Sequence, residues 1–388
     1  MRTYVSKLTK YEEEQMKKVV VIVLVLLMAF SSFACNKQTE PVNKIGIVTG
    51  TVSQGEEEYL AAQNMKKKYG DMIVTATYPD KFQEETETTI SLVTQMAADE
   101  SVKAIVFVQA VPGAAAAIDK VRETRDDILF ICGVVHEDPS AISERADIAM
   151  LVDELSMGER IPKKAKEMGA KTLIHYSFPR HMGYATIKAR YDIMVQTCQE
   201  IGLEFVAATA LDPTGEAGMS GAQQFIVDDL PRKIEEYGKD TAFFSTNCGL
   251  QEPLIRGILN EGAIYPQQCC PSPYHAYPSA LNVDVKGHEG DMQYMLDQIG
   301  LKLKEAGQEK RMSTWGVAIN MLMIEAGVEY AKEFIEGKIT ERNDQEALKR
   351  IIDSLAGGVE VTLSKYVEDG KELDNFYLML ADFYDFSK

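Results

Sequence analysis

The feature that most constrains this chain is a series of short apolar runs in its first half. Each run has five or six residues, too few for a helix, and successive runs begin 20 to 32 residues apart. Between them lie residues with helical spacing, such as Thr86, Ile90, Val93 and Ala97. Strands that are apolar along their whole length are buried on both faces, as in a parallel sheet with helices on each side. The predicted strands are Ile45–Gly50, Met72–Ala76, Ala104–Val108, Ile128–Cys132 and Ile148–Val152.

A second series of the same kind follows Asp153 and Glu154. A chain of 388 residues exceeds the size at which one hydrophobic core usually stops growing, so we expect two sheets of about five and four strands. The predicted fold class is therefore α/β, with two doubly wound parallel-sheet lobes joined by hinge strands. The strands of the second series are predicted at Thr172–Tyr176, Leu203–Ala207, Thr241–Ser245 and Ala263–Tyr265.

The first unit of the chain indicates where a ligand would bind. Its strand is followed by a polar loop that contains Thr51, Ser53 and Gln54. Gly55 and the three acids after it are typical of a helix start, because carboxylates are favoured at the positive end of the helix dipole. In an open α/β sheet, ligands bind at the loops that leave the carboxyl ends of strands. The helix is predicted to cover the sheet with Tyr59, Ala62, Met65 and Tyr69.

The front of the chain has the three regions of a secretory signal. Lys17 and Lys18 precede an apolar run of twelve residues, Val19–Phe30, which is too short to span a bilayer. We therefore predict a signal peptide over residues 1–34, of which 1–15 could be an over-extended start before Met16. A plain secretory signal or a membrane anchor remains the alternative.

The end of this signal resembles a bacterial lipobox. Ser32, Phe33 and Ala34 precede Cys35, with Ser32 at the place of the usual leucine. The resemblance implies that Cys35 is lipidated and becomes the mature N-terminus. Residues 35–43 would then be a polar tether between the lipid and the fold. The expected location is the extracytoplasmic face of the cell membrane.

Charge and cysteine content exclude some classes of protein. The chain has 41 basic and 59 acidic residues, a formal net charge of −18. An acidic surface repels phosphate backbones, so we expect no nucleic-acid partner. Five scattered cysteines follow Cys35, which is not a disulfide framework, although a bridge from Cys248 to Cys269 or Cys270 stays open.

The order of elements resembles the type I periplasmic-binding-protein fold of solute receptors of ABC importers and of the effector domains of sugar-responsive repressors. The segment from Gly46 to Gly55, with its acidic continuation, is similar to a family of uncharacterised bacterial lipoproteins of this fold. The resemblance covers about residues 43 to 388. It implies an N-terminal lobe of residues 44–154 and about 286–388, and a C-terminal lobe of residues 155–285. The return hinge is expected at Val283–Gly290.

A two-lobed binder holds its ligand between loops at the carboxyl ends of strands from both lobes. This geometry selects polar and aromatic residues after the predicted strands. The aromatics could stack on a sugar or base ring, and Arg180 with Asp212 could bind hydroxyls or a carboxylate. The alternative is that the aromatics cap a lobe core and that Arg180 pairs with an acid at the surface. The predicted ligand-binding residues are Thr51, Ser53, Gln54, Asp80, Phe82, Gln109, His136 and Glu137 from the first lobe, and Phe178, Arg180, Asp212, Asn247, Tyr274 and His275 from the second.

Metal and cofactor sites are not predicted. Cys248, Cys269, Cys270 and His275 have suitable chemistry for zinc, but no Cys-x-x-Cys pair occurs and adjacent cysteines rarely ligate one ion together. The glycines near Gly46 do not fit Gly-x-Gly-x-x-Gly, and Gly-x-Ser-x-Gly does not occur.

These patterns predict a lipid-anchored solute-binding protein that captures a small polar molecule, such as a sugar, nucleoside or amino-acid-like compound. The expected partner is the permease of an ABC importer, and no catalysis is expected. One alternative is a sensor that passes ligand occupancy to a membrane partner. The other is a cell-surface enzyme, which would need His136, Glu137, Cys248 and His275 to converge in the cleft.

Overall fold

The structure is a computed structural model that describes residues 15–16, 43–288 and 290–387. Residues 43–388 form one compact unit, and Cys35 with the predicted signal lies outside the described residues. Among the helices described, none is long and apolar enough to cross a membrane.

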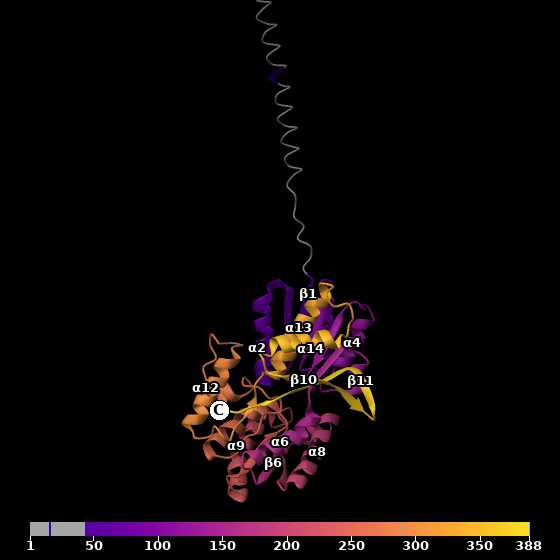
Figure 1. Ribbon diagram of the computed structural model, residues 1–388. Coiled ribbons are helices and arrows are strands. Elements are labelled where there is room, and N and C mark those ends of the chain that lie inside the picture. The colour runs from indigo at the N-terminus through magenta and orange to yellow at the C-terminus, as the bar shows by residue number, and fades with distance from the viewer. Residues whose placement is uncertain (1–14, 17–42, 289, 388) are drawn as a thin grey trace, which may run out of the picture. The chain divides into compact units, whose positions relative to one another are not determined.

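The first sheet has seven strands in the order β10-β11-β5-β4-β3-β1-β2 (Figure 1). All neighbouring pairs are parallel except β10 and β11, which are antiparallel. The five predicted strands are confirmed, and two C-terminal strands extend the sheet beyond β5. The strands are β1 (Lys44–Thr49), β2 (Ile73–Thr77), β3 (Val102–Val108), β4 (Leu129–Gly133), β5 (Ile148–Val152), β10 (Val361–Glu368) and β11 (Lys371–Ala381).

Helices cover both faces of this sheet, as expected for strands that are apolar throughout. Side chains such as Val106 pack on one face with α2 and α13, and alternate residues such as Phe107 pack on the other face with α3 and α4. The helices of this part are α2 (Val52–Tyr69), α3 (Thr86–Ala97), α4 (Ala114–Arg122), α5 (Pro139–Ser143), α13 (Ile319–Ile335) and α14 (Gln345–Leu355), with a short 3-10 helix η1 (Gly70–Met72).

The second sheet is smaller than predicted. It has three parallel strands in the order β7-β6-β8, and the fourth predicted strand is reduced to single bridges at Ile264 and Tyr265. Its strands are β6 (Thr172–Ser177), β7 (Glu204–Thr209) and β8 (Thr241–Ser245). The accompanying helices are α6 (Glu154–Glu167), α7 (Pro179–Met182), α8 (Ala185–Ile201), α9 (Gly218–Tyr237), η2 (Cys248–Leu250), α10 (Gln251–Glu261), α11 (Tyr277–Leu281) and α12 (Met292–Glu305).

The contacts of residues 311–315 bear on where the chain crosses back to the first sheet. Tyr265 bridges Met312, and the Arg311 guanidinium donates to the Gly262 carbonyl, so this segment still belongs with the second sheet. Beyond it, β9 (Thr314–Trp315) pairs with β12 (Phe383–Tyr384). These contacts favour a crossing at residues 314–318 in place of 283–290. The lobe limits at residues 154 and 285 remain a proposal.

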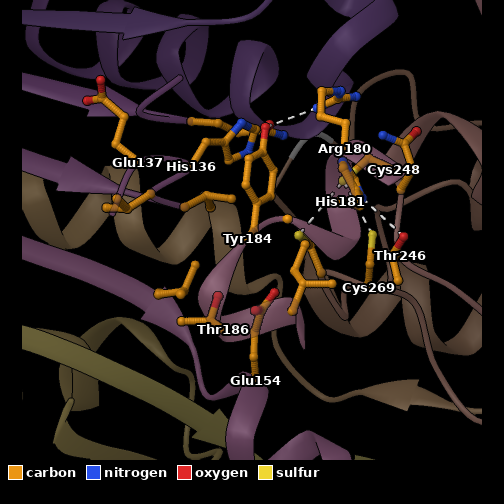
Figure 2. Close-up of a pocket in the computed structure, with 18 of the residues that line it drawn as sticks. His136, Glu137, Glu154, Arg180, His181, Tyr184, Thr186, Thr246, Cys248 and Cys269 are labelled. Carbon is orange, nitrogen blue, oxygen red and sulfur yellow. Dashed lines mark hydrogen bonds between the residues drawn. The ribbon is translucent and has the colours of Figure 1, made fainter. Parts of the chain in front are cut away.

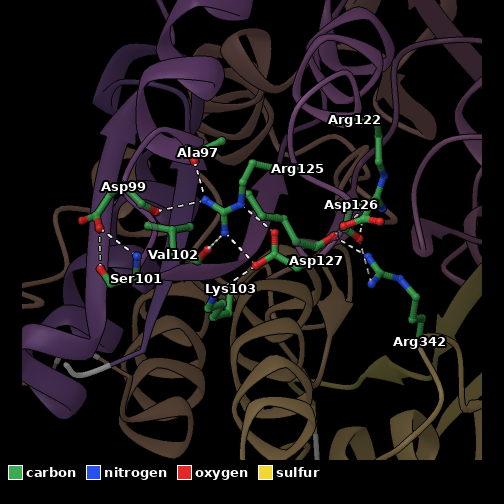
Figure 3. A network of polar contacts seen from close by, with 11 residues as sticks. Ala97, Asp99, Ser101, Val102, Lys103, Arg122, Arg125, Asp126, Asp127 and Arg342 are labelled. Carbon is green, nitrogen blue, oxygen red and sulfur yellow. Dashed lines mark hydrogen bonds and ion pairs between the residues drawn. The ribbon is translucent and has the colours of Figure 1, made fainter. Parts of the chain in front are cut away.

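A polar network fixes the amino-terminal edge of the first sheet, opposite the edge where a ligand would bind (Figure 3). Arg342, from the segment after α13, forms a bidentate ion pair with Asp147, which also binds Arg122. Nearby, Arg125 donates to the Ala97 and Val102 carbonyls. Because Arg342 also donates to the Ile128 carbonyl, it ties the C-terminal segment to the starts of β4 and β5.

Candidate functional site

A cavity of about 190 Å³ lies where the carboxyl ends of both sheets meet (Figure 2). It lies where the type I geometry predicts, because the ends of parallel strands share one edge of a sheet. Seven of the predicted ligand-binding residues line it. From the first series these are Gln54, Phe82, Gln109, His136 and Glu137, and from the second Arg180 and Asn247. His181, Tyr184, Thr186 and Thr246 line the cavity as well.

Tyr184 connects the two sides of this cavity. Its ring stacks on His136, with centroids 5.9 Å apart and an angle of 29° between the planes. Its hydroxyl accepts hydrogen bonds from Arg180 Nη1 at 3.1 Å and from Gln83 Nε2 at 3.4 Å. Side chains from both series therefore close one side of the cavity (Figure 2).

Arg180 and Asp212 lie together, as predicted, but each satisfies the other. Arg180 Nε and Nη2 bind the two carboxylate oxygens at 2.8 and 2.9 Å. Although burial raises the pKa of Asp212, the Arg180 hydrogen bond and the Thr214 backbone lower it to about 2. Phe178 lies under the guanidinium and is only 2% exposed, so it packs in the core and does not line the cavity.

The two imidazoles of the cavity are neutral near pH 7. Burial, and then the charge of Arg180, lowers the pKa of His136 to about 3. The same two causes hold the pKa of His181 well below its usual value. His181 Nδ1 lies 3.0 Å from the Thr246 hydroxyl, which is 3.0 Å from the Ser177 hydroxyl. These groups can exchange hydrogen bonds with a ligand without adding charge.

Several other predicted residues have structural partners. The Glu137 carboxylate accepts hydrogen bonds from the Gly113 and Ala115 amides at the start of α4, a favourable place for an anion. The Thr51 hydroxyl bonds to the Asp80 carboxylate, and neither residue lines the cavity.

The predicted polar loop is in fact a helical turn. The helix α2 begins at Val52, with a kink at Gly55, so Ser53 and Gln54 belong to its first turn. Gln54 Nε2 donates to the Asp80 carbonyl at 3.0 Å. The helix therefore begins three to four residues before the start predicted at Gly55 and the acids after it.

A second cavity of about 270 Å³ lies beside the first. Two further predicted residues, Tyr274 and His275, line it. Ser53 and Gln54 line it as well. Tyr274 donates from its hydroxyl to the His288 carbonyl at 2.9 Å. The predicted ligand-binding set is therefore divided between two cavities.

Sequence reasoning missed two buried glutamates that line the second cavity, Glu57 and Glu58. Glu58 accepts hydrogen bonds from Gln109 Nε2 at 2.9 Å and Asn320 Nδ2 at 2.7 Å. Burial, and then Glu58, raises the pKa of Glu57 to about 8. Burial lowers the pKa of His275, but Glu57, Cys270 and Glu58 together raise it above its usual value.

A signal for these two residues was present in the sequence. Glu57 and Glu58 precede Ala61 and Ala62 by one helical turn, and Met65 continues the same face. Residues four apart share one side of a helix, so the acids lie on the buried face. The predicted stripe through Tyr59 and Tyr69 follows the edge of this face, where both are only half-buried.

Another unpredicted pair lies below the first cavity. Arg190 has no exposed side-chain surface, and its Nη1 donates to Glu154 at 3.1 Å. Burial raises the pKa of Glu154, and Arg190 opposes this effect. The guanidinium also lies 5.0 Å from the centre of the Phe244 ring. This buried pair places a carboxylate on the cavity wall (Figure 2).

The comparisons with known proteins first identify a family. Residues 43–313 match the model of a family described as "Protein of unknown function (DUF3798)". Two proteins of Treponema pallidum (strain Nichols), each described as "Uncharacterized protein", are similar to this chain. One is 37% identical over 169 residues, 44% of this chain and 78% of that protein. The other is 37% identical over 178 residues, 44% of this chain and 80% of that protein.

Solved structures show the same fold. A "Putative transcriptional regulator" from Clostridium difficile 630 has a TM-score of 0.72 at 24% identity, over 88% of this chain and 99% of that one. A sugar ABC transport substrate-binding protein from Bordetella parapertussis 12822 has a TM-score of 0.55 at 13% identity, over 90% of each chain. An ABC transporter periplasmic solute-binding protein from Actinobacillus succinogenes 130z, with bound D-allose, has a TM-score of 0.52 at 14% identity, over 76% of this chain and 92% of that one. The predicted type I periplasmic-binding-protein-like fold is confirmed.

Proposed function

This chain belongs to the family described as "Protein of unknown function (DUF3798)", and we propose that it is an extracytoplasmic solute-binding protein. It captures a small polar molecule, such as a sugar, nucleoside or amino-acid-like compound, in the cavity between its two lobes. Cys35 anchors it to lipid, and the permease of an ABC importer is its partner.

One observation carries this proposal. The cavity lies at the carboxyl ends of both sheets, and side chains from both line it. Such an edge is the usual ligand site of open α/β folds. Neutral His136 and His181, the Tyr184 hydroxyl and the side-chain amide of Gln54 suit a ligand rich in hydroxyl or amide groups. Two solved structures of this fold support the same class of ligand: one is a sugar ABC transport substrate-binding protein, and the other is a solute-binding protein with bound D-allose.

Capture requires that the lobes open. The stacking of Tyr184 on His136 and its hydrogen bond from Gln83 join elements of the two series, and both contacts are weak enough to break. Small-angle scattering should therefore show a smaller radius of gyration with ligand than without it. An equal radius in both states would argue for a rigid protein.

The positions of four residues argue against the enzyme alternative. Glu137 is held by two amides of α4, and His275 lines the second cavity, whereas His136 lines the first. Cys248 borders both cavities. His136, Glu137 and Cys248 line the first cavity and His275 lines only the second, so the full set of four does not converge in one cavity.

The test begins with the ligand itself. Mass spectrometry of the compounds released from protein purified without unfolding should identify a small polar molecule. Calorimetry with that compound should show weaker binding by Gln54→Ala and Tyr184→Phe, by about 5-fold to 100-fold, because each change leaves a buried polar group without its partner at about 1–3 kcal/mol. Gln224→Ala is the matched control, since Gln224 is exposed on α9 and bonds only to Asp228 there.

Two results would contradict the proposal. One is wild-type affinity in both cavity variants, which would place the ligand elsewhere. The other concerns the partner: a protein that binds its solute but neither associates with an importer nor stimulates its ATPase would be a sensor.

A further inference from the structure

Three cysteines gather beside the buried glutamates. Cys248 Sγ lies 3.4 Å from Cys269 Sγ and 3.8 Å from Cys270 Sγ. All three are free thiols. Cys248 lies in η2, after β8. Cys269 and Cys270 lie in the proline-rich segment after Tyr265, 21 and 22 residues further along the chain. The fold, and not a short spacing motif, brings these sulfurs together.

An imidazole completes the group. The ligand atoms of Cys248, Cys269 and His275 all lie within 4.8 Å of one another. In a tetrahedral zinc site with Zn–S bonds of about 2.3 Å, two sulfurs lie about 3.8 Å apart. The 3.4 Å between Cys248 Sγ and Cys269 Sγ is close to this spacing, and one ion can reach all three ligands after small side-chain movements.

The tautomer of His275 suits a metal ligand. Its Nδ1 lies 2.7 Å from the Cys270 carbonyl oxygen. A carbonyl can only accept, so Nδ1 carries the proton and donates it, and Nε2 keeps its lone pair. Metal-binding histidines are commonly held in this way, with the second ring nitrogen bonded to a backbone carbonyl or carboxylate.

Glu57 provides an independent observation. It is 4% exposed, and neither carboxylate oxygen makes a hydrogen bond of ordinary geometry to the residues that the structure describes. It shares the second cavity with Cys248 and His275. A buried carboxyl group without a donor is costly, and a nearby cation would stabilise it.

We infer that Cys248, Cys269 and His275 bind one divalent transition-metal ion of the zinc class. Two thiolates and a neutral imidazole balance the charge of the ion, and this ligand set favours zinc over calcium or magnesium. Three protein ligands leave one coordination position, with Glu57 as the neighbouring carboxylate. The cavities on either side of Cys248 give the ion a path to the site. The inference does not depend on the proposed solute.

Metal binding by the wild-type protein is the first test. Full-length protein, reduced and handled without oxygen, should retain one zinc per chain after exposure to zinc sulfate and gel filtration. Cobalt(II) should give the visible absorption of a tetrahedral site and a thiolate charge-transfer band in the near ultraviolet. Absence of both the retained zinc and the thiolate band would overturn the inference without any variant having to fold.

Variants then assign the ligands. Changes to residues that only support a metal ligand cost about 10-fold to 100-fold in affinity, so Glu57→Gln should weaken zinc binding by that factor. Cys248→Ser and His275→Gln each remove a ligand and should weaken it by at least about 100-fold. Cys198→Ser is the control, because Cys198 is buried in α8 and is outside the ligand group.

Zinc affinity in Cys248→Ser equal to that of wild type would contradict the assignment. The assignment would also be contradicted if the purified protein contained a Cys248–Cys269 disulfide and still failed to bind zinc after that disulfide was reduced.

Discussion

His175 should make the stability of this protein sensitive to acid. It lies in β6 with 1% of its surface exposed, packed against the rings of Tyr191, Phe205 and Phe244. Its Nε2 is buried without a hydrogen-bonding partner among the described residues. Burial, and then the charge of Arg190, lowers the pKa of His175 from 6.5 to about 3. The perturbation that tests this is His175→Phe, which keeps an aromatic ring and removes the titrating group.

The direction of the pH effect on stability follows from how many protons the folded and unfolded states bind. Between pH 6.5 and about 3 the unfolded chain carries a proton on His175 and the folded chain does not. The free energy of unfolding therefore falls as pH falls through this window and is unaffected above it. Between pH 7 and pH 5 the loss due to this one histidine is about 2 kcal/mol, at about 1.4 kcal/mol for each pH unit below the unfolded pKa.

Urea unfolding at pH 7 and pH 5 measures this difference. Trp315 is the single tryptophan and is fully buried, so its fluorescence reports unfolding. His175→Phe should lose about 2 kcal/mol less than wild type between the two pH values. Phe244→Leu, a neighbouring change that does not titrate, should lose as much as wild type. Equal losses in His175→Phe and wild type would refute the reasoning that burial keeps this histidine neutral.

Three further changes test other parts of the structure. Arg342→Ala removes a partner of the mostly buried Asp147 and should cost about 1–3 kcal/mol in urea unfolding, whereas Arg350→Ala, at an exposed pair, should cost under about 1 kcal/mol; equal costs would contradict the role of the network. Gly158→Ala would place a methyl group 2.7 Å from a backbone oxygen of α8 and should lower the free energy of unfolding by about 1–3 kcal/mol. An unchanged melting temperature would show that α6 can shift at no cost and would contradict this prediction. Labelling with palmitate should disappear in Cys35→Ala, and persistent labelling would favour the membrane-anchor alternative.

The strands of the first sheet and their helices could be predicted from the sequence alone. Runs such as Ala104–Val108 are apolar at every position because both faces of a parallel sheet are covered. The helices between them carry their own 3.6-residue pattern, as at Ile118 and Val121. Local composition is enough here, since each segment has only one compatible environment.

The C-terminal strands needed the tertiary structure. The strands predicted from the sequence ended at Ala263–Tyr265, so neither β10 nor β11 was predicted. In the structure β11 adds in parallel beside β5, and β10 pairs with it at the edge. The paired residues of β11 and β5 are more than 200 residues apart, so this pairing depends on a sheet edge that exists only once the earlier strands have assembled.

The candidate site, too, was predictable only in part from the sequence. The edge where ligand-binding side chains collect followed from the order of strands, and seven predicted residues line the first cavity there. What each side chain does was decided by its neighbours: Glu137 bonds to α4, and Arg180 pairs with Asp212. Polar side chains are satisfied by whichever partners the packed chain provides, and the local sequence does not contain those partners.

Cys248 and Cys269, and the two glutamates of α2, show most clearly why part of the site could not be predicted from the sequence. The sequence contains no Cys-x-x-Cys pair and left only a bridge from Cys248 to Cys269 or Cys270 open, and in the structure two segments bring Cys248 Sγ and Cys269 Sγ to 3.4 Å. Glu57 and Glu58 have the composition of an exposed helix start, but α13 and the loop at His275 cover them. A hydrophobic pattern determines which segments are buried. Which polar groups are buried with them is determined by contacts between distant segments, because only those contacts offset the cost of removing such groups from water.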